Sequence, residues 1–418
     1  MLKKHLAHLG LALFSLVTFC AASSAAPPWV ERTLVVGQPG TPCPNAQYTT
    51  ITDAVNAAAP GDVIEICPAL YPEQLTITIP LTLRGLGVDG INRVLIQPSS
   101  LLPVSSLSFE AVITVMNAQG VTIQNLAIDA SKNAASGCTV ALAGIHFYNA
   151  SGIVDSATIS GTQLSNPLSC TTLFPGNGFG VQVDETAGST ASFSVTVRNT
   201  SIHDFGRNGI LVIGSGESVK IDGNSIAGVG PSTGVHQFGV FLADGATGQV
   251  IGNSISQGNC GTIPIPDCFN LRSEGVVLRS VGNGAVVADN MITNVQAGVF
   301  VNGATGAVVT RNTISNVDAL DGIHIQGSIS GLFTKNRIFH VGPLTTDTSS
   351  DEEGCGINDI SGTGSSENNI LANWINDAYC GVAYVSTDRV EANMFLNTLY
   401  ETLNGDDYPV TFPPPVEP

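Results

Sequence analysis

The residues best suited to acid–base chemistry stand at fixed spacings after glycines that recur along the chain. His146 and Tyr148 lie two and four residues after one such glycine, and Gln182 and Asp184 lie at the same spacings after another. A carboxylate beside an imidazole can move a proton, and a guanidinium can hold a substrate carboxylate through two hydrogen bonds. The patch that we predict as catalytic comprises His146, Tyr148, Asp184, His203, Asp204 and Arg207.

A second polar patch follows later glycines at the same spacings. This second patch comprises Arg279, Asn302, His324 and Gln326, with Asp321 beside it. Together with Gln182 of the first column, these four are the substrate-binding residues that we predict. For both patches the alternative interpretation is the ordinary polarity of a mixed exposed face, which contains such residues without catalysis. An outward apolar stripe lies between the patches and is more typical of a surface under a loop or a partner. It comprises Leu211, Ile213, Phe241, Val277 and Phe300.

The glycines that set these spacings belong to a repeated phrase in which an aliphatic residue follows glycine. The glycines are Gly144, Gly180, Gly209, Gly239, Gly275, Gly298, Gly322, Gly356 and Gly381. Within a phrase such as Gly322 to Gln326, apolar residues alternate with period two, which predicts short strands and excludes a helical repeat. The residues two and four positions after each glycine should therefore form two outward columns.

A second phrase, Asn-x-Ile or a close variant, alternates with the first. Its copies begin at Asn224, Asn253, Asn290, Asn312, Asn336, Asn373 and Asn393, with looser copies at Asn125 and Asn199. The shortest repeat is in the low twenties of residues, which is typical of a solenoid of parallel strands. We expect asparagine at one corner of each coil, where it tolerates a left-handed backbone and hydrogen-bonds to the asparagines of neighbouring coils.

With these phrases, the chain resembles the right-handed parallel β-helix, or pectin-lyase-like, superfamily from about Gln47 to Tyr400. The entry is similar too: Tyr48–Ala58 is typical of an amphipathic capping helix, and Val63–Ile66 of the first coil. The resemblance implies an all-β solenoid of about a dozen coils over residues 61–403, with an N-terminal segment and capping helix over residues 26–60. It also implies a glycan-binding groove on the exposed sheet face.

The catalytic motifs of that superfamily are missing from the sequence. The Leu-Gly-Arg-Pro-Trp signature of pectin methylesterases and the Asp-Pro-His-Asp of alginate lyases and epimerases do not occur. Of the polygalacturonase-like set, the one Asp-Asp pair is Asp406-Asp407, beyond the repeats, and no histidine precedes glycine. The resemblance therefore transfers no catalytic residue, and a fold alone does not imply a function.

The N-terminus predicts export. Lys3 and Lys4 precede an apolar run and then small residues, the pattern of a signal peptide ending at residue 25. No later stretch reaches the ~18 apolar residues of a membrane span. We therefore expect a secreted, periplasmic or cell-surface protein, with residues 404–418 as a terminal tail.

Eight cysteines remain after the leader, an even number in a chain bound for an oxidising compartment. Proximity in sequence favours four disulfides over a metal site, because no cluster has the spacing of metal ligands. The pairs are Cys43 with Cys67, Cys138 with Cys170, Cys260 with Cys268, and Cys355 with Cys380.

The formal charge of −18 makes nucleic acid an improbable partner, since binding phosphates needs clustered lysine and arginine. No cofactor is indicated, although the acidic loop at Asp347, Asp351, Glu352 and Glu353 offers oxygen ligands for Ca²⁺. Two function classes stay open: a protein that binds or acts on an extracellular polysaccharide as a lyase, epimerase or hydrolase, and a non-catalytic surface or adhesion protein. The sequence does not indicate an oligomeric state.

Overall fold

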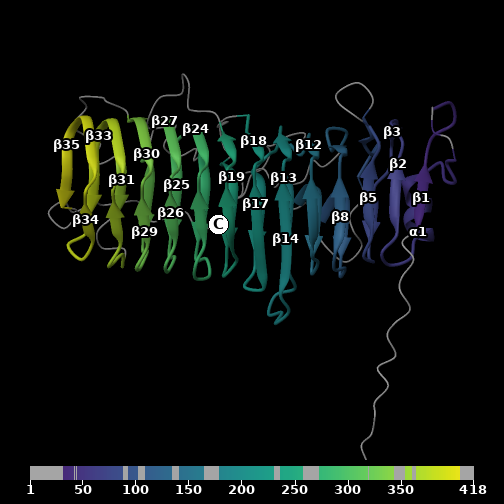
Figure 1. Cartoon of the computed structure of the whole chain (residues 1–418), viewed down its shortest axis with the longest axis horizontal. Helices are drawn as coiled ribbons and strands as arrows, with labels where there is room; N and C mark the ends of the chain where they lie inside the picture. Colours follow the sequence, from purple (N-terminus) through teal and green to yellow (C-terminus); the bar gives the residue numbers. More distant parts are fainter. Residues whose placement is uncertain are drawn as a thin grey trace, which may run out of the picture. The chain divides into compact units, whose positions relative to one another are not determined.

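The computed structural model describes the chain from Arg32 to Asn404, with gaps. The described residues are 32–41, 43, 45–87, 93–101, 109–133, 141–163, 178–229, 236–257, 273–318, 320–342, 354–359 and 364–404. They form stacked coils in which strands of successive coils lie side by side in sequence order (Figure 1). Every strand pairing between coils is parallel, which confirms the predicted all-β parallel solenoid.

One sheet contains the first strand of each coil. Its 13 strands agree with the expected dozen or so coils. They are β1 (Thr33–Val36), β2 (Val63–Ile66), β5 (Thr82–Gly85), β8 (Val121–Gln124), β11 (Gly152–Asp155), β14 (Phe193–Arg198), β17 (Glu217–Asp222), β20 (Thr247–Ile251), β23 (Val286–Ala288), β26 (Val308–Thr310), β29 (Leu332–Thr334), β32 (Asn369–Leu371) and β34 (Arg389–Glu391).

The second sheet has 22 strands in two rows, which we call the near row and the far row. The near row follows the first sheet along the chain and comprises β3 (Leu70–Tyr71), β6 (Leu95–Ile96), β9 (Ala127–Asp129), β12 (Thr158–Ser160), β15 (Ser201–His203), β18 (Ser225–Ala227), β21 (Ser254–Ser256), β24 (Met291–Val295), β27 (Thr313–Val317) and β30 (Arg337–Val341).

The far row completes each coil and carries the glycine phrases. It comprises β4 (Leu75–Ile77), β7 (Phe109–Met116), β10 (Ala141–Tyr148), β13 (Gly178–Asp184), β16 (Asn208–Ile213), β19 (Gln237–Ala243), β22 (Ser273–Arg279), β25 (Ala297–Asn302), β28 (Ile323–Gln326) and β31 (Cys355–Asp359). The long strands β33 (Trp374–Tyr384) and β35 (Met394–Asn404) span both rows in the last coils.

The core consists of inward aliphatic side chains that stack coil on coil. Ile292, Ile314 and Ile338 are register partners and are fully buried. A phrase glycine is required where the coil bends against this column: a Cβ on Gly322 would lie 2.5 Å from Ile338 Cγ2 and 2.6 Å from the Gly356 carbonyl oxygen. The glycine of the first phrase therefore leaves the space that the isoleucine of the second phrase fills.

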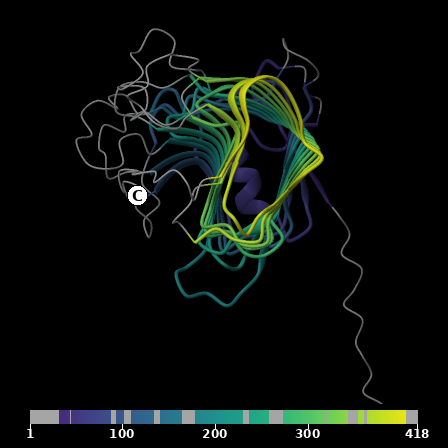
Figure 2. The same cartoon turned by 90° about the vertical axis from the view of Figure 1, so that its left-hand side faces the viewer.

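Helix α1 (Ile51–Ala57) covers the N-terminal end of the core, as predicted. Thr50 caps it by accepting a hydrogen bond from the Asp53 amide, and Ile51 and Ala54 are fully buried. The helix contacts β1, β2 and β4, and Figure 2 shows it within the outline of the coils. Strand β1, however, precedes the helix and pairs with β2, so the first sheet begins at Thr33 and the predicted start at residue 61 is wrong.

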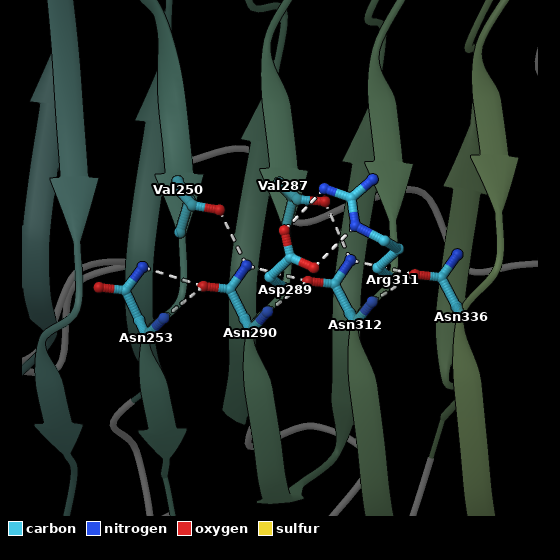
Figure 3. A network of polar contacts seen from close by, with 8 residues as sticks. All are labelled: Val250, Asn253, Val287, Asp289, Asn290, Arg311, Asn312 and Asn336. Atoms are coloured by element: carbon cyan, nitrogen blue, oxygen red, sulfur yellow. Dashed lines mark hydrogen bonds and ion pairs between the residues drawn. The ribbon is translucent and has the colours of Figure 1, made fainter.

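The seven asparagines of the second phrase form one hydrogen-bonded ladder from Asn224 to Asn393. Figure 3 shows its middle part, from Asn253 to Asn336. At each step the side-chain amide and the backbone amide of one asparagine donate to the Oδ1 of the next, at 2.9–3.1 Å. The predicted ladder is confirmed, and its members from Asn224 to Asn373 are buried.

Two details of the ladder prediction are wrong. The left-handed backbone belongs to the residue before the ladder asparagine, as at Arg311 with φ 56°. Asn125 and Asn199 occupy that left-handed position themselves, and the ladder position beside Asn199 is Thr200, whose backbone amide donates to Asn224 Oδ1. The residue with the left-handed backbone is exposed at both Asp289 and Arg311. These two side chains form an ion pair between neighbouring coils (Figure 3).

Two of the predicted disulfides are present. Cys43 bonds to Cys67 and Cys355 bonds to Cys380, with Cα–Cα distances of 6.0 and 4.4 Å. Cys355 and Cys380 are register partners on adjacent coils, as their place directly before two phrase glycines predicts. The pairs Cys138 with Cys170 and Cys260 with Cys268 lie outside the described residues, as does the acidic loop at 347–353.

Replacing both Cys355 and Cys380 with alanine should lower the free energy of unfolding by about 3 kcal/mol, the chain-entropy value for a loop of this size. A peptide map of the non-reduced wild-type protein should contain the two cysteines in one linked pair. A variant lacking Cys43 and Cys67 is the matched control, because it should keep that pair. Free, alkylated thiols at both positions would contradict the assignment.

Candidate functional site

The far row presents the two outward columns that the glycine spacing predicts. His146 pairs in register with Gln182, and Gln182 with Leu211. Tyr148 pairs with Asp184 in the second column. Further along the same columns, Phe300 pairs with His324 and Asn302 with Gln326. The predicted placement of these side chains on one sheet face is therefore confirmed.

The first column is not open to solvent, so that part of the prediction is wrong. His146 is 0% exposed, Gln182 4% and His324 7%. The Phe109 ring stacks on the His146 imidazole with centroids 4.1 Å apart, and β7 pairs with β10 on the preceding coil. A buried imidazole cannot touch a substrate, so any role of His146 must act through a neighbour.

That neighbour is Asp184, whose side chain is 19% exposed. The two atoms His146 Nε2 and Asp184 Oδ1 lie 2.7 Å apart, and Gln182 Nε2 donates to Asp184 Oδ2 at 2.7 Å. The carboxylate is thus held from both sides by groups of the buried column. His146 Nδ1 has no hydrogen-bond partner. The arrangement fixes an outward carboxylate that can accept a proton or a sugar hydroxyl.

Tyr148 lies beside this carboxylate on the adjacent coil. Its hydroxyl is 3.0 Å from Thr186 Oγ1, to which Asn149 Nδ2 also donates at 2.8 Å. The His146 and Tyr148 ring centroids are 5.9 Å apart. Tyr148 and Asp184 are both half-buried, so this edge of the far row offers a phenol and a carboxylate to solvent.

The other predicted catalytic residues do not join them. His203 ends β15 in the near row, and its Nδ1 lies 2.7 Å from Asp204 Oδ2 in an exposed pair. Arg207 lies close enough to Arg279 for that charge to act on it, and burial together with Arg279 lowers the pKa of Arg207 to about 10. Arg207 thus belongs with the second patch, and the six-residue catalytic patch divides into separate groups.

The second patch contains one buried polar cluster. Asp321 is fully buried and accepts from the Cys355 amide at 2.9 Å and from Asn358 Nδ2 at 3.0 Å, and its Oδ2 lies 2.8 Å from His324 Nδ1. These bonds tie the coils beside the Cys355–Cys380 disulfide.

The other predicted binding residues of the second patch are half-buried. Asn302 Nδ2 donates to Gln326 Oε1 at 3.3 Å, and the Arg279 guanidinium lies 5.3 Å from the centroid of the Phe241 ring.

Glu217 is an acid that the sequence argument missed. It points inward at the start of β17, is 1% exposed, and neither carboxyl oxygen has a hydrogen-bond partner. Burial, and then the charges of Glu185 and Asp184, raise the pKa of Glu217 to about 8. The signal was available, because Glu217, Val219 and Ile221 share one face of an alternating strand.

Several solved structures are similar to this chain. The A-module of a mannuronan C-5 epimerase from Azotobacter vinelandii is 12% identical with a TM-score of 0.47, over 84% of this chain and 91% of that one. An alginate lyase from Paenibacillus is 14% identical with a TM-score of 0.39, over 84% and 95%. A pectin methylesterase from Aspergillus niger is 15% identical with a TM-score of 0.37, over 80% and 94%. No curated protein matches the chain.

A family model described as periplasmic copper-binding protein (NosD) matches residues 266–353. Two histidines of this range each contact an aspartate through Nδ1. His324 bonds to Asp321, and His340 Nδ1 lies 2.6 Å from Asp377 Oδ2. Nowhere among the described residues do three histidine, cysteine or acidic side chains gather as metal ligands.

No helix in the described part of the chain is long and apolar enough to cross a membrane. The parallel coils and the asparagine ladder show that the described part of the chain is a parallel β-helix.

Proposed function

We propose that the protein is exported and binds an extracellular polysaccharide at the edge of the far row, where Asp184 and Tyr148 act on it. The observation that carries the proposal is the Asp184 carboxylate, held by His146 and Gln182 and still partly exposed beside a phenol. Asp184 would accept the proton, and Tyr148 would donate one or position the sugar. His146 is then a positioning residue.

This assignment fits a lyase or epimerase type of reaction better than hydrolysis by two carboxylates. In the described part of the site, the second carboxyl near Asp184 with a raised pKa is Glu217, which is 1% exposed and points into the core. Proton abstraction from a sugar needs one base and one acid at the surface, which Asp184 and Tyr148 supply.

Turnover on a panel of extracellular polysaccharides tests the proposal, with Ca²⁺ added in one series and chelated in the other because the sequence contains the acidic run at residues 351–353. Readouts are absorbance of unsaturated sugar products, reducing ends, and NMR of the sugar ring for epimerisation. Asp184→Asn should lower turnover at least 100-fold, the usual contribution of a general base. Asp222→Asn, an exposed acid paired with Lys220 on the first sheet, should leave it unchanged.

Equal turnover of the Asp184→Asn variant and the wild type would overturn the catalytic assignment. The second candidate function, a non-catalytic surface or adhesion protein, is favoured by the burial of the first column, which ties both histidines to aspartates. Saturable glycan binding with no turnover of any polysaccharide would establish that alternative.

A further inference from the structure

Away from the far row, the near row carries a partly exposed cluster of aromatic and cationic side chains near the C-terminal end. We call Arg337, Phe339 and Trp374 the Trp374 platform. The Arg337 guanidinium carbon lies 4.8 Å from the Trp374 ring centroid and 5.7 Å from that of Phe339. The two rings meet edge to face with centroids 5.0 Å apart. Arg337 and Trp374 are register partners on β30 and β33, so the platform is built on rigid strands.

The guanidinium of Arg337 forms no ion pair with a carboxylate of the described residues. Arg198, Arg311 and Arg389 each form an ion pair with a neighbouring carboxylate. Among the described residues, the Arg337 guanidinium contacts only the two aromatic rings. The side chain is exposed, and its N–H groups are free to donate to a ligand. Because the rings restrict the guanidinium before binding, less conformational freedom is lost when it meets a carboxylate.

An apolar surface adjoins this cation. Met394 follows Trp374 in register on β35 and is 65% exposed. Trp374 is half-buried, and its indole N–H has no hydrogen-bond partner within the described residues. Aromatic faces carry partial negative charge and therefore attract the polarised C–H groups of a sugar ring. Arg337, which can bind a carboxylate, thus lies directly beside Trp374 and Met394, which offer an apolar surface to a sugar ring.

A hollow of about 230 Å³ continues this surface at the corner after the near row. Its lining residues are Asn316, Val317, Asp318, His340, Val341, Gly342 and Asp377. His340 directly follows Phe339 in the chain, so the hollow and the platform are neighbours. The volume is below the ~300 Å³ of sites for drug-sized ligands, which suits one small ring. Asn316 and the His340–Asp377 pair supply hydrogen-bonding groups for hydroxyls.

We propose that the Trp374 platform and this hollow bind an acidic saccharide. The uronate carboxylate accepts two hydrogen bonds from Arg337, and the sugar ring packs on Trp374 and Met394. Hydroxyl groups of the adjoining sugar reach Asn316 and His340. The proposal shares the ligand class of the proposed function but lies on different strands, so it is independent of any reaction at Asp184. An anchor here would hold a chain of sugars while another part of it meets the far row.

Tryptophan fluorescence tests the site directly, because the chain has two tryptophans, Trp29 and Trp374. In a Trp29→Phe background the signal reports on Trp374 alone. The full chain is titrated with oligogalacturonate and oligomannuronate, and in parallel with neutral cello-oligosaccharides and with sodium sulfate. A uronate oligosaccharide should give a saturable change, and the neutral sugars and sulfate should not.

Three variants make the result specific to the platform. Arg337→Gln should weaken uronate binding at least tenfold, and Arg337→Lys should also weaken it because lysine lacks the two-pronged donor. Arg311→Gln, an exposed arginine already paired with Asp289, is the matched control and should bind as the parent does. Asp184→Asn should likewise keep the fluorescence change, which separates this site from the far row.

Several outcomes would overturn the proposal. A folded protein with no saturable response to either uronate has no such site. An equal response to sulfate shows a simple anion site, and an equal response to neutral sugars shows that the carboxylate is not recognised. A dimer detected by light scattering and abolished by Trp374→Ala would mean that a second copy covers the platform. By contrast, loss of turnover in the Asp184→Asn variant with uronate binding retained would support the Trp374 platform as a separate binding site.

Discussion

Replacing Asn312 with leucine should lower the free energy of unfolding by about 4 kcal/mol, since several buried polar groups lose their partners at once. Asn312 is fully buried in the middle of the ladder. Its Nδ2 donates to the Val287 carbonyl and to Asn336 Oδ1, and its Oδ1 accepts two bonds from Asn290. Leucine has a similar volume but satisfies none of these groups. Urea unfolding at constant pH measures the difference.

The matched control is Asn302→Leu. Asn302 is a half-buried asparagine of the far row, and its Nδ2 donates a hydrogen bond to Gln326 Oε1 at 3.3 Å. Its loss should cost less than about 1 kcal/mol. If the two variants unfold at the same urea concentration, the buried ladder contributes no more to stability than a half-buried contact.

Raising the pH should destabilise the wild-type protein more than a Glu217→Gln variant. The pKa of Glu217 is about 8 in the folded protein and near 4.5 when the side chain is exposed, so the folded state binds the extra proton between these values. Its stabilising contribution is full below pH 4.5 and is lost as the pH rises towards and through 8. By linkage the loss is on the order of 5 kcal/mol at pH 9.

Glutamine imitates the protonated acid and cannot ionise, so the variant should keep its stability where the wild type loses it. Urea unfolding at pH 5, 7 and 9 compares the two proteins. Glu391→Gln is the control, because that exposed acid pairs with Arg389, which lowers its pKa. Parallel pH profiles of the wild type and Glu217→Gln would show that Glu217 is ionised in the folded protein.

A second buried acid should act in the same direction. Asp359 is fully buried in the last coils, where it accepts a hydrogen bond from Asn368 Nδ2 at 2.7 Å. Burial and the neighbouring charge of Asp388 raise the pKa of Asp359. The two acids therefore favour the folded state in acidic surroundings.

The register of the far row could be predicted from sequence because two strict signals agree. The glycine sets where each strand bends against an isoleucine, and the period-two alternation sets which side chains face outward. For that reason His146 and Gln182, or Asn302 and Gln326, are found as partners although 36 and 24 residues separate them in the chain. Because the coils stack in parallel, residues at the same spacing after their phrase glycines become register partners on neighbouring strands.

Exposure could not be predicted in the same way, because it depends on side chains from other coils. Phe109 covers His146, and nothing in the spacing around Gly144 indicates that ring. The grouping of the catalytic patch failed for a related reason: His203 follows a ladder position and lies in the near row, whereas His146 follows a glycine and lies in the far row. Both patterns produce outward polar residues, but on different rows.

The asparagine ladder also gives the solenoid an electrical direction. At every step one side-chain N–H points to the coil that follows and the Oδ1 atom points to the coil before, from Asn224 to Asn393, while the second N–H donates to a backbone carbonyl. Seven side-chain dipoles thus align head to tail, as peptide dipoles do in an α-helix, and hydrogen bonds in such a row polarise one another. The protein thereby carries a line of partial charge along its stack, positive towards the last coils, made from neutral residues that no change of pH can titrate.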